Sequence, residues 1–90
     1  MKKKIAVLGS TGSIGKNLLS IIKKNPKKYQ VLLLSANKNY KELLSQAKIF
    51  NVKNLVITDQ NIYKKIKDKK IFKNINLFQN FSCFSKIFNK

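Results

Sequence analysis

A chain of 90 residues is long enough for one small domain and too short for two. Its hydrophobic content of 43% is higher than that of disordered proteins, and no apolar run approaches the roughly 18 residues of a membrane span. The formal charge of +17 comes from lysines spread along the whole chain, which favours a solvated surface over a nucleic-acid footprint. The single cysteine, Cys83, excludes an internal disulfide and fits a reducing compartment, so we expect a cytoplasmic protein.

The first part of the chain alternates apolar runs with an amphipathic stretch. Residues 5–8 form a short apolar run that ends at a glycine, which is typical of a parallel strand buried on both faces. Residues 14–24 carry apolar side chains at helical spacing, and Asn25-Pro26 ends this helix because proline cannot donate the next helical hydrogen bond. Residues 31–34 predict a second buried strand.

The rest of the chain repeats this alternation. We expect Asn39 to cap a second helix, with Glu42 reaching back to the backbone amide of the cap. Residues 55–57 predict a third strand, Asp59 is expected to cap a third helix, and residues 75–78 predict a weaker fourth strand. The order βαβαβαβ indicates an α/β fold of the Rossmann-like, doubly wound type, with a parallel sheet and right-handed crossovers.

The carboxy-terminal residues do not fit this alternation. Phenylalanines crowd the segment 78–88, and no glycine or capping residue is evident there to end a helix. We therefore expect these rings to lack a packing partner. An open strand edge and an exposed aromatic patch would make the chain marginally stable, dimeric or prone to aggregation.

Three glycines lie between the first strand and the first helix, with the spacing G-x-x-G-x-x-G. We expect Gly9 to permit a sharp turn off the strand, Gly12 to let backbone amides approach a pyrophosphate, and Gly15 to let helix and strand pack closely. The unpaired amides at the helix start carry partial positive charge, which favours a bound anion. Hydroxyl donors flank these amides at Ser10, Thr11 and Ser13. Because a strand precedes the turn and another follows its helix, the pattern predicts a site for the phosphates of a nicotinamide dinucleotide.

The end of the second strand distinguishes the two nicotinamide cofactors. An NAD site places an Asp or Glu there to accept a hydrogen bond from the ribose 2′-hydroxyl, and residues 35–39 contain neither. They offer amides and the cation of Lys38, which suit the 2′-phosphate of NADP. The alternative, in which Lys38 is one more surface lysine and Asn39 only a helix cap, stays open.

The turn, the end of the first helix and the loop after the second strand together resemble one family. The matching segments are Leu8-Gly9-Ser10-Thr11-Gly12-Ser13-Ile14-Gly15, Asn25-Pro26 and Ala36-Asn37-Lys38-Asn39. They are similar to the amino terminus of the 1-deoxy-D-xylulose 5-phosphate reductoisomerases. Asn37 stands where that family often has glycine, and asparagine tolerates the left-handed backbone that the loop would then need.

The resemblance implies an NADP-dependent oxidoreductase and isomerase of non-mevalonate isoprenoid biosynthesis. Such an enzyme converts a sugar phosphate, 1-deoxy-D-xylulose 5-phosphate, to 2-C-methyl-D-erythritol 4-phosphate with NADPH and a divalent metal, Mg or Mn, and the complete protein is a homodimer. The resemblance also implies which residues contact NADPH. These are Thr11, Gly12, Ser13, Ile14, Asn37, Lys38 and Asn39.

The same resemblance predicts what this chain does not contain. We expect residues 1–80 to form the amino-terminal part of the NADP-binding domain and residues 81–90 a truncated or aberrant tail, with the catalytic and carboxy-terminal domains absent. The sequence has no histidine and only three acidic residues, so we assign neither a catalytic residue nor a metal ligand. The 90-residue chain alone is therefore expected to be inactive.

Two other functions remain open from the sequence. A small basic nucleic-acid-binding protein would show affinity that falls steeply with salt, but it would leave the glycine turn unexplained. A fragment of another NADP-dependent reductase or epimerase could share the glycine spacing, although residues 36–39 argue against it. Neither alternative calls for a membrane partner.

Overall fold

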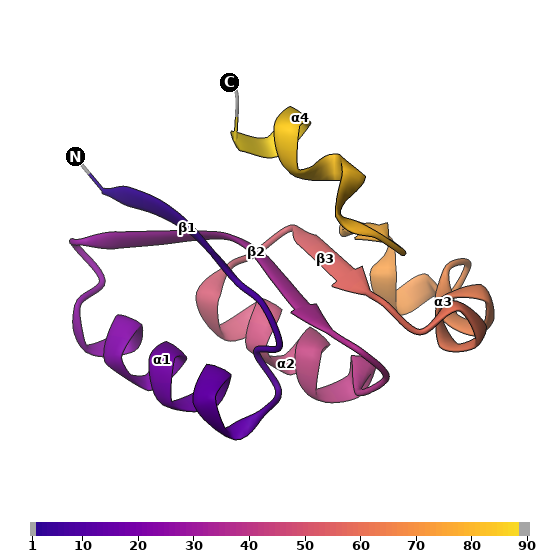
Figure 1. Ribbon diagram of the computed structural model, residues 1–90, viewed down its shortest axis with the longest axis horizontal. Coiled ribbons are helices and arrows are strands. Elements are labelled where there is room, and N and C mark those ends of the chain that lie inside the picture. The colour runs from indigo at the N-terminus through magenta and orange to yellow at the C-terminus, as the bar shows by residue number, and fades with distance from the viewer. Residues whose placement is uncertain (1, 89–90) are drawn as a thin grey trace.

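The fold is built on one four-stranded sheet in which all neighbouring strands are parallel (Figure 1). The structure is a computed structural model, and it describes residues 2–88. The strands lie in the order β1-β2-β3-β4, with bounds β1 Lys3–Val7, β2 Tyr29–Ala36, β3 Asn54–Ile57 and β4 Asn76–Phe78. The helices are α1 Ser13–Lys24, α2 Tyr40–Phe50, α3 Gln60–Ile66 and α4 Phe84–Phe88, with single 3-10 turns η1 Lys70–Phe72 and η2 Phe81–Cys83.

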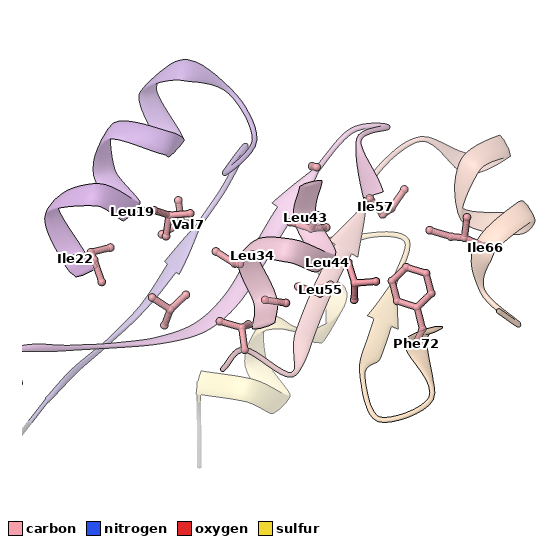
Figure 2. Packing of buried hydrophobic residues seen from close by; sticks show 14 residues of the cluster. Val7, Leu19, Ile22, Leu34, Leu43, Leu44, Leu55, Ile57, Ile66 and Phe72 are labelled. Atoms are coloured by element: carbon pink, nitrogen blue, oxygen red, sulfur yellow. The ribbon is translucent and has the colours of Figure 1, made fainter. Parts of the chain in front are cut away.

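The larger part of the core lies between one face of the sheet and the crossover helices (Figure 2). Leu19 and Ile22 of α1 and Leu43 of α2 pack there against inward-facing residues of β1, β2 and β3, and Ile66 of α3 and Phe72 extend the same cluster. Parallel strands require such crossovers, and the helices that return along one face bury its apolar side chains. The expected Rossmann-like α/β fold and the order βαβαβαβ are thus confirmed.

The opposite face of the sheet is covered by the carboxy-terminal segment. Leu33 and Val56 point to this face and form a second buried cluster with Cys83, against which Phe84 and Ile87 pack. Figure 1 shows α4 on the other side of the sheet from α1 and α2. The expectation that the aromatic rings lack a packing partner is therefore wrong for Phe78 and Phe84, whose partner is the face that the crossover helices leave uncovered. Phe81 and Phe88 lie against Phe84, and Phe81 stays exposed.

Cys83 illustrates how closely this segment packs. Its side chain is buried, and desolvation by burial raises the pKa of the thiol, with a weaker opposing effect from a backbone hydrogen bond. The segment also has a capping residue that is not evident from the sequence. The side chain of Asn80 accepts hydrogen bonds from both the amide and the hydroxyl of Ser82, at 3.0 and 2.6 Å.

A bulge in β2 allows both clusters to draw on an unbroken apolar run. The register with β1 pairs Ile5 with Val31 but Ala6 with Leu33, so Leu32 is an extra residue. The bulge directs Val31 to the helix-covered face and Leu33 to the opposite face. The carbonyl of Leu32 accepts a hydrogen bond from Nδ2 of Asn54 in β3 at 3.0 Å, which satisfies a group in the disturbed ladder.

Helix boundaries follow the capping residues. The side chains of Asn39 and Asp59 accept hydrogen bonds from the amides of Glu42 and Ile62 at 3.2 and 2.9 Å, so both predicted caps are confirmed. The predicted end of α1 at Asn25 is also confirmed. The left-handed residue that ends α2, Asn51 with φ of 55°, was not predicted.

One edge of the sheet is less protected. Within residues 2–88, β1 pairs with β2 alone, and an apolar stripe formed by Leu8, Ile14, Leu18 and Ile21 lies exposed beside it. The association expected from an open strand edge stays a prediction. None of the helices in the described part of the chain has the length and hydropathy needed to cross a bilayer.

Candidate dinucleotide-binding site

The loops that follow the first three strands meet at the carboxyl edge of the sheet. The turn after β1 and the loops after β2 and β3 share this edge because the three strands are parallel. Two backbone hydrogen bonds join the second and third loops, from the amide of Thr58 to the carbonyl of Ala36 and from the amide of Asp59 to the carbonyl of Asn37, both at 3.0 Å. Ligands of open α/β sheets bind at this edge.

Gly9 and Gly15 give the turn its shape. Gly9 has φ of +66°, a left-handed backbone conformation that residues other than glycine adopt only at a cost in free energy. A Cβ placed on Gly15 would lie 2.4 Å from the carbonyl oxygen of Gly9 and 2.6 Å from Cα of Ser10. The start of α1 therefore rests directly on the backbone of the turn, and the roles predicted for these two glycines are confirmed.

Gly12 differs from the other two, because the chain itself does not require a glycine there. Its backbone is extended, with φ of −79° and ψ of 170°, and an added Cβ would make only a 3.4 Å contact with the carbonyl oxygen of Gly9. Gly12 also lines an open depression at the start of α1. Open space at a helix terminus is what a bound phosphate needs.

The first turn of α1 presents unpaired donors to this space. Gly12 is the N-cap, no side chain caps the helix, and the first turn contains no acidic residue. Within residues 2–88, the amides of Ser13, Ile14 and Gly15 donate to no backbone or side-chain acceptor. Three free amides together with the positive end of the helix dipole form an anion-binding terminus.

Ser10 does not serve as a ligand donor, which corrects the expectation from the sequence. Its side chain is fully buried, and its hydroxyl donates to Oε1 of Gln46 at 2.7 Å. Nε2 of Gln46 donates in return to the carbonyl oxygen of Ser10 at 2.8 Å. The hydroxyl groups of Thr11 and Ser13 remain accessible, so the donors beside the turn are these two.

The side chains of the loop after β2 already make contacts within the protein that the sequence does not predict. Oδ1 of Asn37 accepts from the hydroxyl of Thr58 at 2.9 Å, and Nζ of Lys38 lies 3.8 Å from a carboxylate oxygen of Asp59. Asn39 caps α2 with Oδ1 and donates through Nδ2 to Oε2 of Glu42 at 3.0 Å. Glu42 thus contacts the side-chain amide of the cap in place of the backbone amide that the sequence predicts. The helix-cap role of Asn39, which is the alternative to a ligand contact, is thus present in the structure.

Two donors of this loop stay available to a ligand. The side chain of Lys38 is 67% exposed, so its distant pairing with Asp59 leaves it free to turn toward another anion. Nδ2 of Asn37 has no acceptor within the described residues. The expectation of a left-handed backbone at Asn37 is wrong, because Asn51 is the one residue other than glycine with positive φ in residues 2–88. Asn37 is held by its contacts to the third loop instead.

An ion pair connects the first turns of α1 and α2. Nζ of Lys16 lies 2.8 Å from Oε1 of Glu42, while Oε2 of the same carboxylate accepts from Asn39. The contacts run from the helix that follows the glycine turn to the residue that caps the helix after β2. No local pattern in the sequence predicts this pairing.

An open depression of about 400 Å³ lies against the glycine turn, between the end of β1 and the start of α1. Gly12, Ser13 and Ile14 line it together with the apolar side chains of Leu8 and Leu18. A hollow of similar volume, about 430 Å³, lies at the opposite edge of the sheet, where none of the predicted contact residues lines it. We place the candidate site at the first depression, because the free amides are there.

The described residues do not form a metal centre. No group of three or more histidine, cysteine, aspartate or glutamate side chains lies close enough within residues 2–88 to hold a metal ion. Glu42 and Asp59, the acidic residues nearest the site, are already engaged in caps and ion pairs. The divalent metal implied by the family resemblance thus finds no donor set here.

A parallel sheet whose first turn combines these glycines with an uncapped helix terminus defines a dinucleotide-binding α/β domain of the Rossmann type. The chain belongs to the 1-deoxy-D-xylulose 5-phosphate reductoisomerase family, whose sequence profile matches residues 5–82. This match decides against the alternative of another reductase or epimerase.

Individual relatives agree with this assignment. The reductoisomerase of Pelagibacter ubique is 51% identical over 89 residues, which is 97% of this chain and 22% of that protein. The enzyme of Wolbachia pipientis wMel is 46% identical over 66 residues, covering 73% and 17% of the two chains. This chain therefore spans about a fifth of the length of such relatives.

Solved structures show the same fold. The reductoisomerase from Zymomonas mobilis in complex with NADPH superposes with a TM-score of 0.75 at 37% identity, over 87% of this chain and 21% of that one. A reductoisomerase in complex with magnesium reaches a TM-score of 0.79 at 24% identity over 97% and 22% of the two chains, a likeness of fold alone.

Proposed function

We propose that this chain holds the adenosine side of NADPH, as the amino-terminal part of a 1-deoxy-D-xylulose 5-phosphate reductoisomerase. The observation that carries the proposal is the uncapped start of α1, where the amides of Ser13, Ile14 and Gly15 face an open space that Gly12 keeps clear. The relative solved with NADPH belongs to the same family and has the same fold, which supports the choice of cofactor.

The residues divide into two groups by the phosphate that each would bind. Thr11, Gly12, Ser13 and Ile14 surround the helix terminus and would hold the pyrophosphate through backbone amides and hydroxyls. Asn37, Lys38 and Asn39 lie at the end of β2, where the ribose of a bound dinucleotide is placed, and would receive the 2′-phosphate. Lys38 and Nδ2 of Asn37 supply the free donors of the second group.

The complete enzyme would use NADPH as hydride donor to convert 1-deoxy-D-xylulose 5-phosphate to 2-C-methyl-D-erythritol 4-phosphate, as a homodimer with a divalent metal. This chain would contribute only cofactor binding, because no metal centre forms within its described residues. A cytoplasmic setting, where NADPH is available and a lone cysteine stays reduced, agrees with this function.

A titration of the purified 90-residue chain with 2′-phospho-ADP and with ADP tests the proposal. We expect weak but saturable binding of 2′-phospho-ADP, and weaker binding of ADP, which lacks the 2′-phosphate. Gly12→Asp should abolish both because it places a side chain and a negative charge in the phosphate space. Unchanged binding by Gly12→Asp, or binding that depends on salt but not on Gly12, would instead support a basic nucleic-acid-binding protein.

A further inference from the structure

A buried clamp of two hydrogen bonds holds the centre of the glycine turn from α2. The Ser10 hydroxyl donates to Oε1 of Gln46 at 2.7 Å, and Nε2 of Gln46 donates to the Ser10 carbonyl at 2.8 Å. Both residues are buried, with exposed fractions of 0% and 8%. A side-chain amide that gives and accepts one bond each with the same residue fixes that residue in both position and orientation.

A second anchor comes from β2. The amide of Ser10 donates to the carbonyl of Ser35 at 2.8 Å, and the amide of Gly9 donates to the Ser35 hydroxyl oxygen at 3.0 Å. Ser35 is itself 3% exposed, so this network is shielded from water. Two residues of the turn are thus tied to two other elements of the fold.

The position of this turn determines where the free amides point. Gly15 approaches the carbonyl of Gly9 and Cα of Ser10 so closely that α1 cannot shift toward the turn. Movement of Ser10 toward α1 is therefore passed to the first turn of this helix, which bears the unpaired amides of Ser13 and Ile14. Hydrogen bonds to an anion weaken steeply when donors leave their alignment.

We propose that Gln46 is a positioning residue for the pyrophosphate, acting through Ser10 on the amides at the start of α1. The identity of the ligand in this inference rests on the proposed function, whereas the contacts between Gln46 and Ser10 do not depend on it. An amide is needed at residue 46, because an ionised carboxylate could accept from the Ser10 hydroxyl but could not donate to the Ser10 carbonyl.

Three variants of the 90-residue chain test the inference. Gln46→Leu removes both bonds of the clamp with similar volume, and Gln46→Glu retains the shape but loses the donor. Asn54→Leu is the matched control, because it also removes two side-chain bonds and touches no part of the turn. Nδ2 of Asn54 donates to the Leu32 carbonyl at 3.0 Å, and its Oδ1 accepts from Nδ2 of Asn76 at 3.1 Å. The probe is 2′-phospho-ADP, titrated at a temperature where each variant is folded.

Positioning predicts that Gln46→Leu weakens binding at least tenfold while Asn54→Leu changes it less than twofold. In Gln46→Glu, affinity relative to the unmodified chain should recover as the pH falls, because a protonated carboxyl again offers one donor and one acceptor. Equal losses in Gln46→Leu and Asn54→Leu would show that residue 46 contributes only stability. Binding by Gln46→Leu within twofold of the unmodified chain would also overturn the proposal.

Hydrogen exchange of the free chain provides a readout that does not depend on the ligand. Gln46→Leu should accelerate exchange of the Ser10 and Gly12 amides at least tenfold beyond the change seen in Asn54→Leu. If the unmodified chain binds no 2′-phospho-ADP, the proposed function fails, and this exchange still decides whether Gln46 holds the turn. If these amides exchange at the same rate in Gln46→Leu as in the control, residue 46 does not hold the turn. If Gln46→Leu does not fold, Gln46→Glu takes its place in this measurement.

Discussion

The three glycines between β1 and α1 are required for different reasons. Gly9 supplies a left-handed backbone, Gly15 supplies contact without a side chain, and Gly12 leaves space that the protein does not fill. Only the first two demands arise from folding. A substitution at each position should therefore separate stability from ligand binding.

Gly15→Ala should lower the free energy of unfolding by about 2 kcal/mol, because its Cβ would collide with backbone atoms that cannot turn aside. Gly12→Ala is the matched control and should stay within about 0.5 kcal/mol of the unmodified chain, as its Cβ meets only an ordinary contact. Urea denaturation measures both. Equal stability of the two variants would show that α1 does not rest on the turn.

At this scale the sequence predicts some site residues well and others poorly. Glycine spacing and helix caps are local patterns, so the turn and the roles of Asn39 and Asp59 can be predicted from neighbouring residues. The clamp from Gln46 to Ser10 spans 36 positions and depends on how α2 packs, which local patterns do not encode. A signal was present nonetheless: Gln46 lies beside Leu43 and Ala47 on the apolar face of α2, and a polar side chain there needs a buried partner.

Among the elements, α2 connects the two halves of the candidate site. Gln46 holds the glycine turn, and Glu42 joins Lys16 of α1 to Asn39 of the loop after β2. The carboxylate of Glu42 is also the negative charge that competes with a ligand for the cation of Lys16. Its removal should thus act on binding and on stability in opposite directions.

Glu42→Gln should destabilise the chain by about 0.5–1 kcal/mol, because a partly exposed ion pair and a charge at the start of α2 are lost. The same variant should bind 2′-phospho-ADP about two- to fivefold more tightly, since Lys16 is released and a repelling charge is gone. Calorimetric titration at low and high salt measures this, and the gain should shrink as salt rises. Weaker binding at low salt would mean that Glu42 orders the site rather than competing with the ligand.

The carboxy-terminal elements are where sequence reasoning was least successful. The alternation of strands and helices predicts all four strands, because each is marked by its own apolar run. It does not reveal that the second face of the sheet needs a cover. The strand order β1-β2-β3-β4 places all crossover helices on one face, and this order cannot be read from the alternation alone. The bulge at Leu32, which turns Leu33 toward that face, likewise has no local signature.

Cys83 reports whether this cover stays in place. Burial raises the pKa of its thiol, so less of the reactive thiolate is present at a given pH than in the unfolded chain, and access is also blocked. Alkylation by iodoacetamide at about pH 8 should be at least about tenfold slower in the folded chain than in denaturant. Equal rates would show that η2 and α4 leave the sheet in solution.

For the whole molecule, the balance of charge opposes folding. The formal charge is +17, and two ion pairs lie within the described residues, so most of the positive charge is not neutralised by an acidic partner there. Such self-repulsion weakens a compact state and is screened by salt. The exposed stripe beside β1 adds apolar surface to a molecule that already resists association through its charge.

The melting temperature should rise by a few degrees when sodium chloride is increased from about 20 to about 300 mM, because the Debye length shortens and repulsion falls. Gly12→Asp separates this general effect from chloride binding at the turn, because the variant cannot bind an anion there. Its melting temperature should rise with salt by nearly the same amount as that of the unmodified chain. Differential scanning fluorimetry is sufficient for the comparison. A melting temperature that falls with salt would indicate that attractive charge pairs dominate.

The most direct test of the account follows the backbone amides of the labelled chain by NMR while 2′-phospho-ADP is added. The amides of Ser13, Ile14 and Gly15 should show the largest shifts, and those of Lys38 and Asn39 should follow only when the 2′-phosphate is present. Shifts scattered over the lysine-rich surface, with these three amides unchanged, would contradict a phosphate site at the start of α1.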